Sequence, residues 1–228
     1  MSQRPSDPLA QRILAALPQT QCTRCGYPDC AAYANAIAQD SAPINQCPPG
    51  GAEGIRRLAV ITGKPTLAHL PLNPDNGQEG PRAVAVIDEN WCIGCTLCID
   101  ACPTDAILGS NKLMHTVIEP YCTGCELCLP VCPVDCIAME NVTGASTGWQ
   151  AWSQPLADEA RSRYEVRSDR LERSEADRIK RQTSELQAKL SDMPAHSRIT
   201  DPTALEKKRA VVEAALARAR ARSAGGQP

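Results

Sequence analysis

Thirteen cysteines constrain the fold of this 228-residue chain more than any other feature, because twelve of them fall into three groups of four. Eight of the twelve lie in two copies of one motif, since Cys92 to Ile107 aligns with Cys122 to Ile137 at an offset of 30 residues. Each copy reads Cys-x2-Cys-x2-Cys-x3-Cys-Pro. Two copies of one unit predict a pseudo-symmetric pair of sites, so we expect this part of the chain to fold around bound metal.

The repeated motif is the bacterial ferredoxin pattern for 4Fe-4S clusters, in which three close cysteines wrap one cluster and the fourth ligates the other. Soft thiolates suit iron, and the two-residue spacing lets successive thiolates reach different iron atoms. A pair of zinc sites is a poor alternative because both full copies of the motif are present. The crossover predicts two ligand sets: set B is Cys92, Cys95, Cys98 and Cys132, and set C is Cys122, Cys125, Cys128 and Cys102.

Glycine and proline recur at equivalent positions of the two motifs. Gly94 and Gly124 stand where the backbone must pass close to the cluster, and a residue without Cβ permits both that approach and unusual dihedral angles. Pro103 and Pro133 favour an extended conformation in the cysteine before each of them. We therefore expect each fourth cysteine to point away from its own loop and towards the neighbouring cluster.

The third group of cysteines is less specific. Set A is Cys22, Cys25, Cys30 and Cys47. Its spacing fits a 4Fe-4S cluster, and it fits a four-cysteine zinc site as well. Spacing alone leaves both interpretations open.

The stretches Leu17 to Cys30, Ala31 to Ile37 and Asn45 to Gly51, followed by a two-cluster domain, closely resemble the B subunit of the Rnf (also called Rsx) electron transport complex. The resemblance covers about residues 9 to 142. It implies a third cluster on set A, and so three 4Fe-4S clusters in all. It also implies electron transfer within a membrane complex that exchanges electrons between ferredoxin and a nicotinamide cofactor, coupled to ion movement.

The expected location follows from hydrophobicity and from the cysteines. The family's B subunit usually starts with a membrane-spanning helix, whereas the longest apolar runs here, such as Ala83 to Ile87, are far shorter than the roughly 20 residues that span a bilayer. We expect no secretory signal, because the N-terminus is polar and no apolar region with a small-residue cleavage site follows it. We expect a cytoplasmic protein, or one held peripherally on the cytoplasmic face of the inner membrane by its partners, where reducing conditions favour metal-bound thiolates over disulfides.

We expect an α+β fold that metal ligation helps to stabilise, because the chain has no Phe and only three Trp and four Tyr. The expected regions are a lead-in (1–20), a mainly helical four-cysteine domain (21–65), a linker (66–82), a two-cluster ferredoxin domain (83–142) and a charged helical extension (143–228).

The elements inside these regions follow from composition and from capping residues. Expected helices are Pro8–Leu17, Cys30–Gln39, Ala52–Thr62, Gln154–Met193 and a last helix from about Thr200 to Arg222, with the extension split at Pro194. Expected strands are Ala83–Ile87, Met114–Ile118 and Ile137–Met139. A short helical turn is expected after each run of three cysteines.

Several residues that suggest further chemistry have simpler interpretations. Cys136 aligns with Ala106 in the repeat, so we interpret it as a small packing side chain outside the ligand sets. Trp91 and Tyr121 precede the two motifs and are expected to pack over the clusters. The histidines are isolated from the cysteine groups and are interpreted as structural: His69, His115 and His196.

The charge distribution and the absence of nucleotide-binding motifs limit the partners and ligands that we expect. Residues 1–149 hold 8 Lys+Arg against 14 Asp+Glu, and residues 150–228 hold 16 against 12, so an acidic head precedes a basic tail. No Gly-rich phosphate loop follows a strand, so we expect neither flavin nor NAD on the chain and no catalytic site of its own. Basic residues of the tail are interleaved with acids, which favours a solvated helical face over nucleic-acid binding.

The expected function is electron transfer as an Rnf-type B subunit, with redox proteins as partners: either other Rnf-type subunits or a ferredoxin. Two alternatives remain open. One is a free-standing soluble multicluster ferredoxin that serves another reductase. The other is a non-redox interaction protein that bound metal stabilises.

Overall fold

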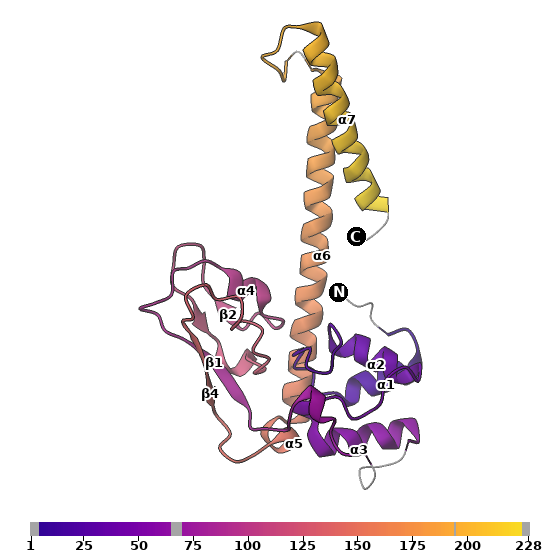
Figure 1. The fold of residues 1–228 in the computed structure, drawn as a ribbon, viewed down its shortest axis with the longest axis vertical. Helices are drawn as coiled ribbons and strands as arrows, with labels where there is room; N and C mark the ends of the chain where they lie inside the picture. The colour runs from indigo at the N-terminus through magenta and orange to yellow at the C-terminus, as the bar shows by residue number, and fades with distance from the viewer. Residues whose placement is uncertain (1–4, 65–69, 194, 225–228) are drawn as a thin grey trace. The chain divides into compact units, whose positions relative to one another are not determined.

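The computed structural model describes residues 5–64, 70–193 and 195–224 (Figure 1). The chain divides into two compact units, Met1–Arg167 and Ser168–Pro228. Helices and two small antiparallel sheets give the α+β fold that the sequence predicts. Among the helices of the described residues, none combines the length and the hydrophobicity that crossing a bilayer requires. Pro194 and His69 lie outside the described residues.

Three helices form the N-terminal part of the first unit: α1 (Pro8–Ala16), α2 (Cys30–Ala38) and α3 (Gly51–Thr62). Asp7 and Asp29 cap α1 and α2 by accepting hydrogen bonds from backbone N–H groups, and Gly63 ends α3 in a left-handed conformation. The sequence predicts all three to within one or two residues. Their buried side chains form one hydrophobic core, which includes Ile13, Leu17, Tyr33, Ile37 and Leu58.

The ferredoxin part contains both sheets. Strand β1 (Ala83–Ile87) pairs with β4 (Ile137–Asn141), and β2 (Ile107–Leu108) pairs with β3 (Thr116–Val117). The three expected strands are present, although β3 is shorter and β4 is longer than predicted. Ala85 lies opposite Met139 in the register of the larger sheet.

Only the first motif has the helical turn that was expected in both. Helix α4 (Leu97–Ala101) contains Cys98, the last cysteine of the first run, and the residues after it, and the N–H of Asp100 donates to Thr96 O at 3.1 Å. The expectation is wrong for the second run, where Pro130 stands at the position equivalent to Asp100. Proline has no N–H to make this bond, so the segment stays a turn.

Residues 148–167, which we call the brace, join the two parts of the first unit. The brace consists of α5 (Gly148–Ala151) and the start of α6 (Gln154–Ser191). On the N-terminal part, Trp152 Nε1 donates to Pro18 O at 2.8 Å and Tyr164 OH donates to Asp29 at 3.1 Å. On the ferredoxin part, the guanidinium of Arg163 lies 3.0 Å from the ring centre of Tyr121.

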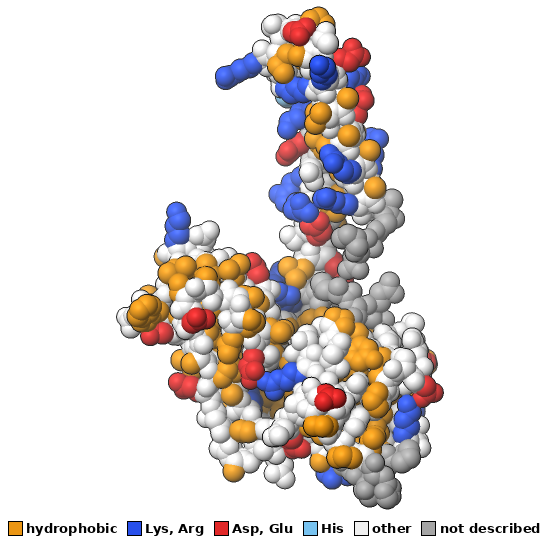
Figure 2. Space-filling model, viewed as in Figure 1, with side chains coloured by type: hydrophobic (Ala, Val, Ile, Leu, Met, Phe, Trp, Pro, Cys, Tyr) orange, Lys and Arg blue, Asp and Glu red, His pale blue; other side chains and the backbone are white. Residues whose placement is uncertain are grey.

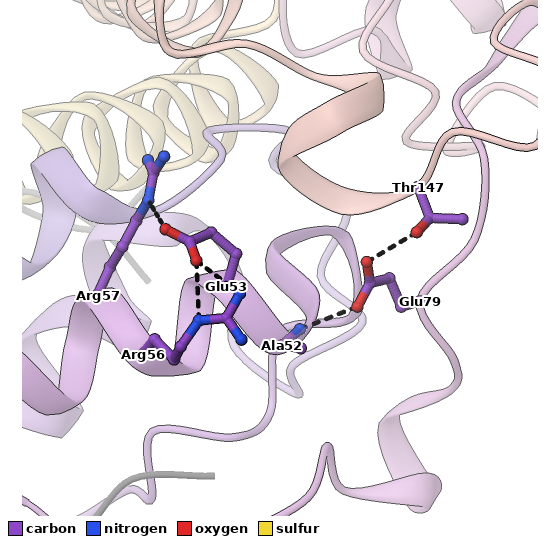
Figure 3. A network of polar contacts seen from close by, with 6 residues as sticks. All are labelled: Ala52, Glu53, Arg56, Arg57, Glu79 and Thr147. Carbon is purple, nitrogen blue, oxygen red and sulfur yellow. Dashed lines mark hydrogen bonds and ion pairs between the residues drawn. The ribbon is translucent and has the colours of Figure 1, made fainter.

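The segment before β1 is more than a spacer. Glu79 accepts hydrogen bonds from Ala52 N and from Thr147 Oγ1, both at 2.9 Å (Figure 3). It therefore ties the start of α3 to the chain just before the brace. In the same view, Glu53 pairs with Arg56 and Arg57 on the surface of α3.

The second unit contains the rest of α6 and helix α7 (Pro202–Ala224). Both were expected from the helical composition and from the Thr-Asp-Pro sequence before α7. Met193, Leu216 and Ala219 are its buried apolar side chains among the described residues. Most of its other side chains are exposed, as the high charge of this segment predicts.

Candidate metal centres

The four cysteines of set C line one cavity. Ala85 and Ala106 also line this cavity, which has about 320 Å³ of empty space including its mouth. Cys102 comes from the first motif and the other three from the second, so the fold brings together the residues that the crossover predicts. Burial, followed by the charges of Cys125, Cys122 and Cys102, raises the pKa of Cys128 to about 12. Three of the four side chains are buried: Cys102, Cys122 and Cys128.

Set B is more open to solvent, since only Cys98 is buried. Burial, followed by the charges of Cys95 and Cys92, raises the pKa of Cys98 to about 11, so these three thiols are neighbours. Cys132 Sγ lies 3.5 Å from Cys136 Sγ. Burial raises the pKa of Cys136 to about 12, with further contributions from Cys132 and then Cys92. Cys136 thus lies between Cys132 and Cys92, the fourth and the first cysteine of set B.

Backbone N–H groups point at the sulfurs of both sets in a pattern that follows the repeat. Ala85 N donates to Cys122 Sγ and His115 N donates to Cys92 Sγ, both at 3.4 Å. Ala106 N donates to Cys102 Sγ at 3.2 Å. Such bonds stabilise the negative charge of metal-bound thiolates, so the surroundings fit iron–sulfur clusters.

Gly94 and Gly124 have φ of 66° and 68°, in the left-handed region that favours glycine. A Cβ at Gly94 would collide with the backbone of Leu113, and one at Gly124 would collide with the carbonyl of Ala83. The unusual dihedral angles agree with the sequence prediction, and in the structure the close approach at each glycine is to the backbone of the other half-repeat. These contacts hold each cysteine loop against the backbone that donates to its first sulfur.

Buried glutamines support the loop that holds Cys22 and Cys25 of set A and ends at Cys30, the first residue of α2. Cys30 N donates to Gln21 Oε1 at 2.9 Å, and Gln19 Nε2 donates to Leu14 O. Both glutamines are almost fully buried and have positive φ. Burial, followed by the charges of Cys30 and Cys22, raises the pKa of Cys47 well above its usual value, which shows that these thiols are close together. No pattern in the sequence indicated that Gln19 and Gln21 shape this loop.

Among the described residues, no three His, Cys, Asp or Glu side chains converge on one point as the ligands of a single ion would.

His115 corrects one sequence interpretation. It was expected to be isolated from the cysteine sets, but its Nδ1 lies 3.3 Å from Cys98 Sγ and only 1% of the residue is exposed. The repeat could have indicated this contact, because His115 aligns at the 30-residue offset with Ala85, whose backbone N–H donates to a sulfur of set C. Trp91, which was expected to pack over a cluster, is 67% exposed.

Sets A and C approach each other where the two parts of the first unit meet. Thr123, which follows a ligand of set C, donates from Oγ1 to Thr20 O at 3.0 Å. Arg24 pairs with Glu126 at 2.6 Å. Burial alone would lower the pKa of Arg24, but Glu126 and the nearby Cys22 and Cys125 raise it. Arg24 therefore lies between a cysteine of set A and a cysteine of set C.

Comparisons with known proteins agree with this geometry. Residues 85–139 match the model of a family described as a 4Fe-4S dicluster domain, and residues 17–49 match one described as a putative Fe-S cluster. The B subunit of the ion-translocating oxidoreductase complex of Azoarcus sp. is 59% identical over 152 residues, which cover 67% of this chain and 81% of that protein. This chain belongs to the family of these B subunits. Its function is electron transfer by bound iron–sulfur clusters, as the resemblance implied.

Other members of the family show the same relationship. The B subunit of the Pseudomonas aeruginosa complex is 54% identical over 152 residues, covering 65% of this chain and 76% of the relative. That of Alkalilimnicola ehrlichii is 52% identical over 157 residues, covering 68% and 82%. No solved structure matches the chain.

Proposed function

We propose that the chain carries electrons through three 4Fe-4S clusters, held by sets A, B and C, as a subunit of an ion-translocating oxidoreductase complex. The observation that carries this proposal is the cavity in which Cys102 of the first motif joins three cysteines of the second. When bound, each cluster would supply a centre that takes up and releases one electron. The protein holds the ligands, donates hydrogen bonds to their sulfurs and limits the access of water.

The contacts between the ligand sets support the order A, C, B. Set C lies next to set A through the Thr123–Thr20 bond and the Arg24–Glu126 pair. It lies next to set B because the two sets exchange their fourth cysteines. Burial agrees with this order, since set C has three buried cysteines and the sets at the two ends have one each.

Exposed apolar side chains support exchange with a partner protein at set B. Figure 2 shows hydrophobic side chains gathered over the part of the first unit that contains α4 and β2. The first motif and the segments beside it expose six large ones: Trp91, Ile93, Leu97, Leu108, Leu113 and Met114. Thr123, which is equivalent to Ile93, is instead buried against the N-terminal part. The thirteen free cysteines support a position on the reducing, cytoplasmic side of the membrane, where other subunits would hold the chain.

The test of the ligand sets is anaerobic purification followed by iron, sulfide and zinc analysis and by EPR of the reduced protein. We expect about twelve iron atoms per chain, that is three clusters of four, and signals that appear on reduction. Cys30→Ser and Cys102→Ser should each lose about four iron atoms, from different signals. About eight iron atoms with one zinc would contradict the cluster on set A. Protein that holds no reducible cluster would favour the non-redox interaction protein.

Membership of a complex needs its own experiment. A tagged chain, purified from a membrane fraction solubilised in mild detergent, should retain other subunits of the complex. Recovery of the chain alone, in the soluble fraction, would favour the free-standing ferredoxin. The control is the same tag on an unrelated protein.

A further inference from the structure

The two cluster sites of the ferredoxin part differ at two equivalent positions. At the 30-residue offset, Ala85 beside set C corresponds to His115 beside set B. Ala106 beside set C corresponds to Cys136 beside set B. Set C therefore has two methyl groups where set B has an imidazole and a thiol, and all four residues adjoin ligand sulfurs.

Both polar side chains contact ligands of set B. His115 reaches Cys98 Sγ with Nδ1 at 3.3 Å, while its backbone N–H donates to Cys92 Sγ. Its Nε2 is buried without a hydrogen-bond partner among the described residues. A proton on Nδ1 faces a sulfur acceptor, whereas a proton on Nε2 would be a buried donor left unpaired, which is costly. Cys136 Sγ is 3.5 Å from the sulfur of Cys132.

Set C keeps the backbone bonds and has no imidazole or thiol at these two positions. Ala85 and Ala106 donate only through their backbone N–H groups. Two hydroxyls lie nearby, and each donates to a carbonyl: Thr104 to Tyr121 O at 2.8 Å and Thr123 to Thr20 O at 3.0 Å. The Thr123 hydroxyl also lies beside Cys125, where it opposes the rise in pKa that burial causes. The Thr104 hydroxyl is also 3.9 Å from Cys102 Sγ, which is long for a hydrogen bond.

We propose that His115 and Cys136 are positioning residues that donate hydrogen bonds to Cys98 and Cys132, and so give the set B cluster a higher reduction potential than the set C cluster. This inference rests on the proposed function. Reduction adds one negative charge, which N–H and S–H donors at the ligand sulfurs stabilise. Because set B lies at the end of the proposed order, the difference would favour movement of an electron from the buried site to the exposed one.

The test is an EPR-monitored redox titration of the full chain with all clusters bound. Cys136→Ala introduces the residue that set C already has, so it should fold, and one of the midpoint potentials should fall while the others stay in place. His115→Ala should lower the same potential. His115→Asn should restore it in part, because the asparagine side chain can place an N–H near the position of Nδ1.

Ala106→Cys is the matched reciprocal variant. It adds a thiol beside set C and should raise a different potential from the one that Cys136→Ala lowers. Iron analysis accompanies every titration. Full iron with unchanged potentials in both the His115→Ala and Cys136→Ala variants would overturn this inference and leave the proposed function intact. Loss of about four iron atoms from Cys136→Ala would also overturn it, because Cys136 would then be a ligand. A wild-type chain without three clusters would refute the proposed function itself.

Discussion

At the scale of single residues, glycine positions hold the cysteine loops in place. Gly124 lies between two cysteines of set C with φ of 68°, and a Cβ there would meet the carbonyl of Ala83 in strand β1. Gly144 has φ of 59° and open space around its Cβ position. Both residues therefore have a positive φ that favours glycine, but only at Gly124 would a Cβ collide with another atom.

We expect Gly124→Ala to destabilise the protein by clearly more than Gly144→Ala does. The left-handed conformation alone costs a non-glycine residue about 1 kcal/mol. Gly124→Ala adds a collision that separates the set C loop from β1, so it should also lower the iron content. Thermal unfolding and iron analysis of both variants measure this. Equal destabilisation of the two would contradict the role of Gly124 in close backbone approach.

At this scale the sequence predicts most of the candidate site, because local spacing in the motif defines the predicted ligand sets. His115 was missed because its contact with Cys98 depends on pairing between half-repeats, which local spacing does not report. The burial of Gln19 and Gln21 was missed for a similar reason, because it depends on how an irregular loop packs and not on a periodic pattern of apolar residues.

At the scale of elements, the brace was the least predictable part of the first unit. Trp152, Ala157 and Ala160 form a short buried cluster around the start of α6, although most of the residues of this helix are charged or polar. In contrast, α1, α2 and α3 carry their own capping and stop signals and were predicted nearly to the residue. The missing helical turn of the second motif depended on one proline, Pro130, within an otherwise matching repeat.

Trp152→Ala should cost about 3–5 kcal/mol of unfolding free energy, as expected for a buried tryptophan. Trp152 is 5% exposed, donates to Pro18 O and lies under the guanidinium of Arg82 at 5.0 Å. Trp91→Ala is the control, since Trp91 is 67% exposed and should change stability little. Denaturant unfolding of both variants measures the difference. A similar loss of stability in both would show that the brace does not stabilise the first unit.

At the scale of the whole molecule, the division of the chain lies inside what the sequence presents as one extension. The charged helical pattern runs without interruption through α6, so nothing in composition marks a boundary between Arg167 and Ser168. The boundary is instead defined by tertiary contacts. Residues up to Arg167 contact the ferredoxin part, where Arg167 pairs with Asp105 at 3.4 Å.

This boundary predicts different results for two truncations. A chain that ends after Arg167 keeps the brace and every predicted ligand, so it should retain about twelve iron atoms, from three clusters of four, and the wild-type melting temperature of the cluster-binding unit. A chain that ends after Ser146 loses the Trp152, Arg163 and Tyr164 contacts between the N-terminal and ferredoxin parts. We expect it to melt at a lower temperature and to be cut by protease in the segment before β1. If the two truncated chains melted alike, the contacts between the two parts would not depend on the brace, and the Arg24–Glu126 and Thr123–Thr20 contacts would have to be sufficient.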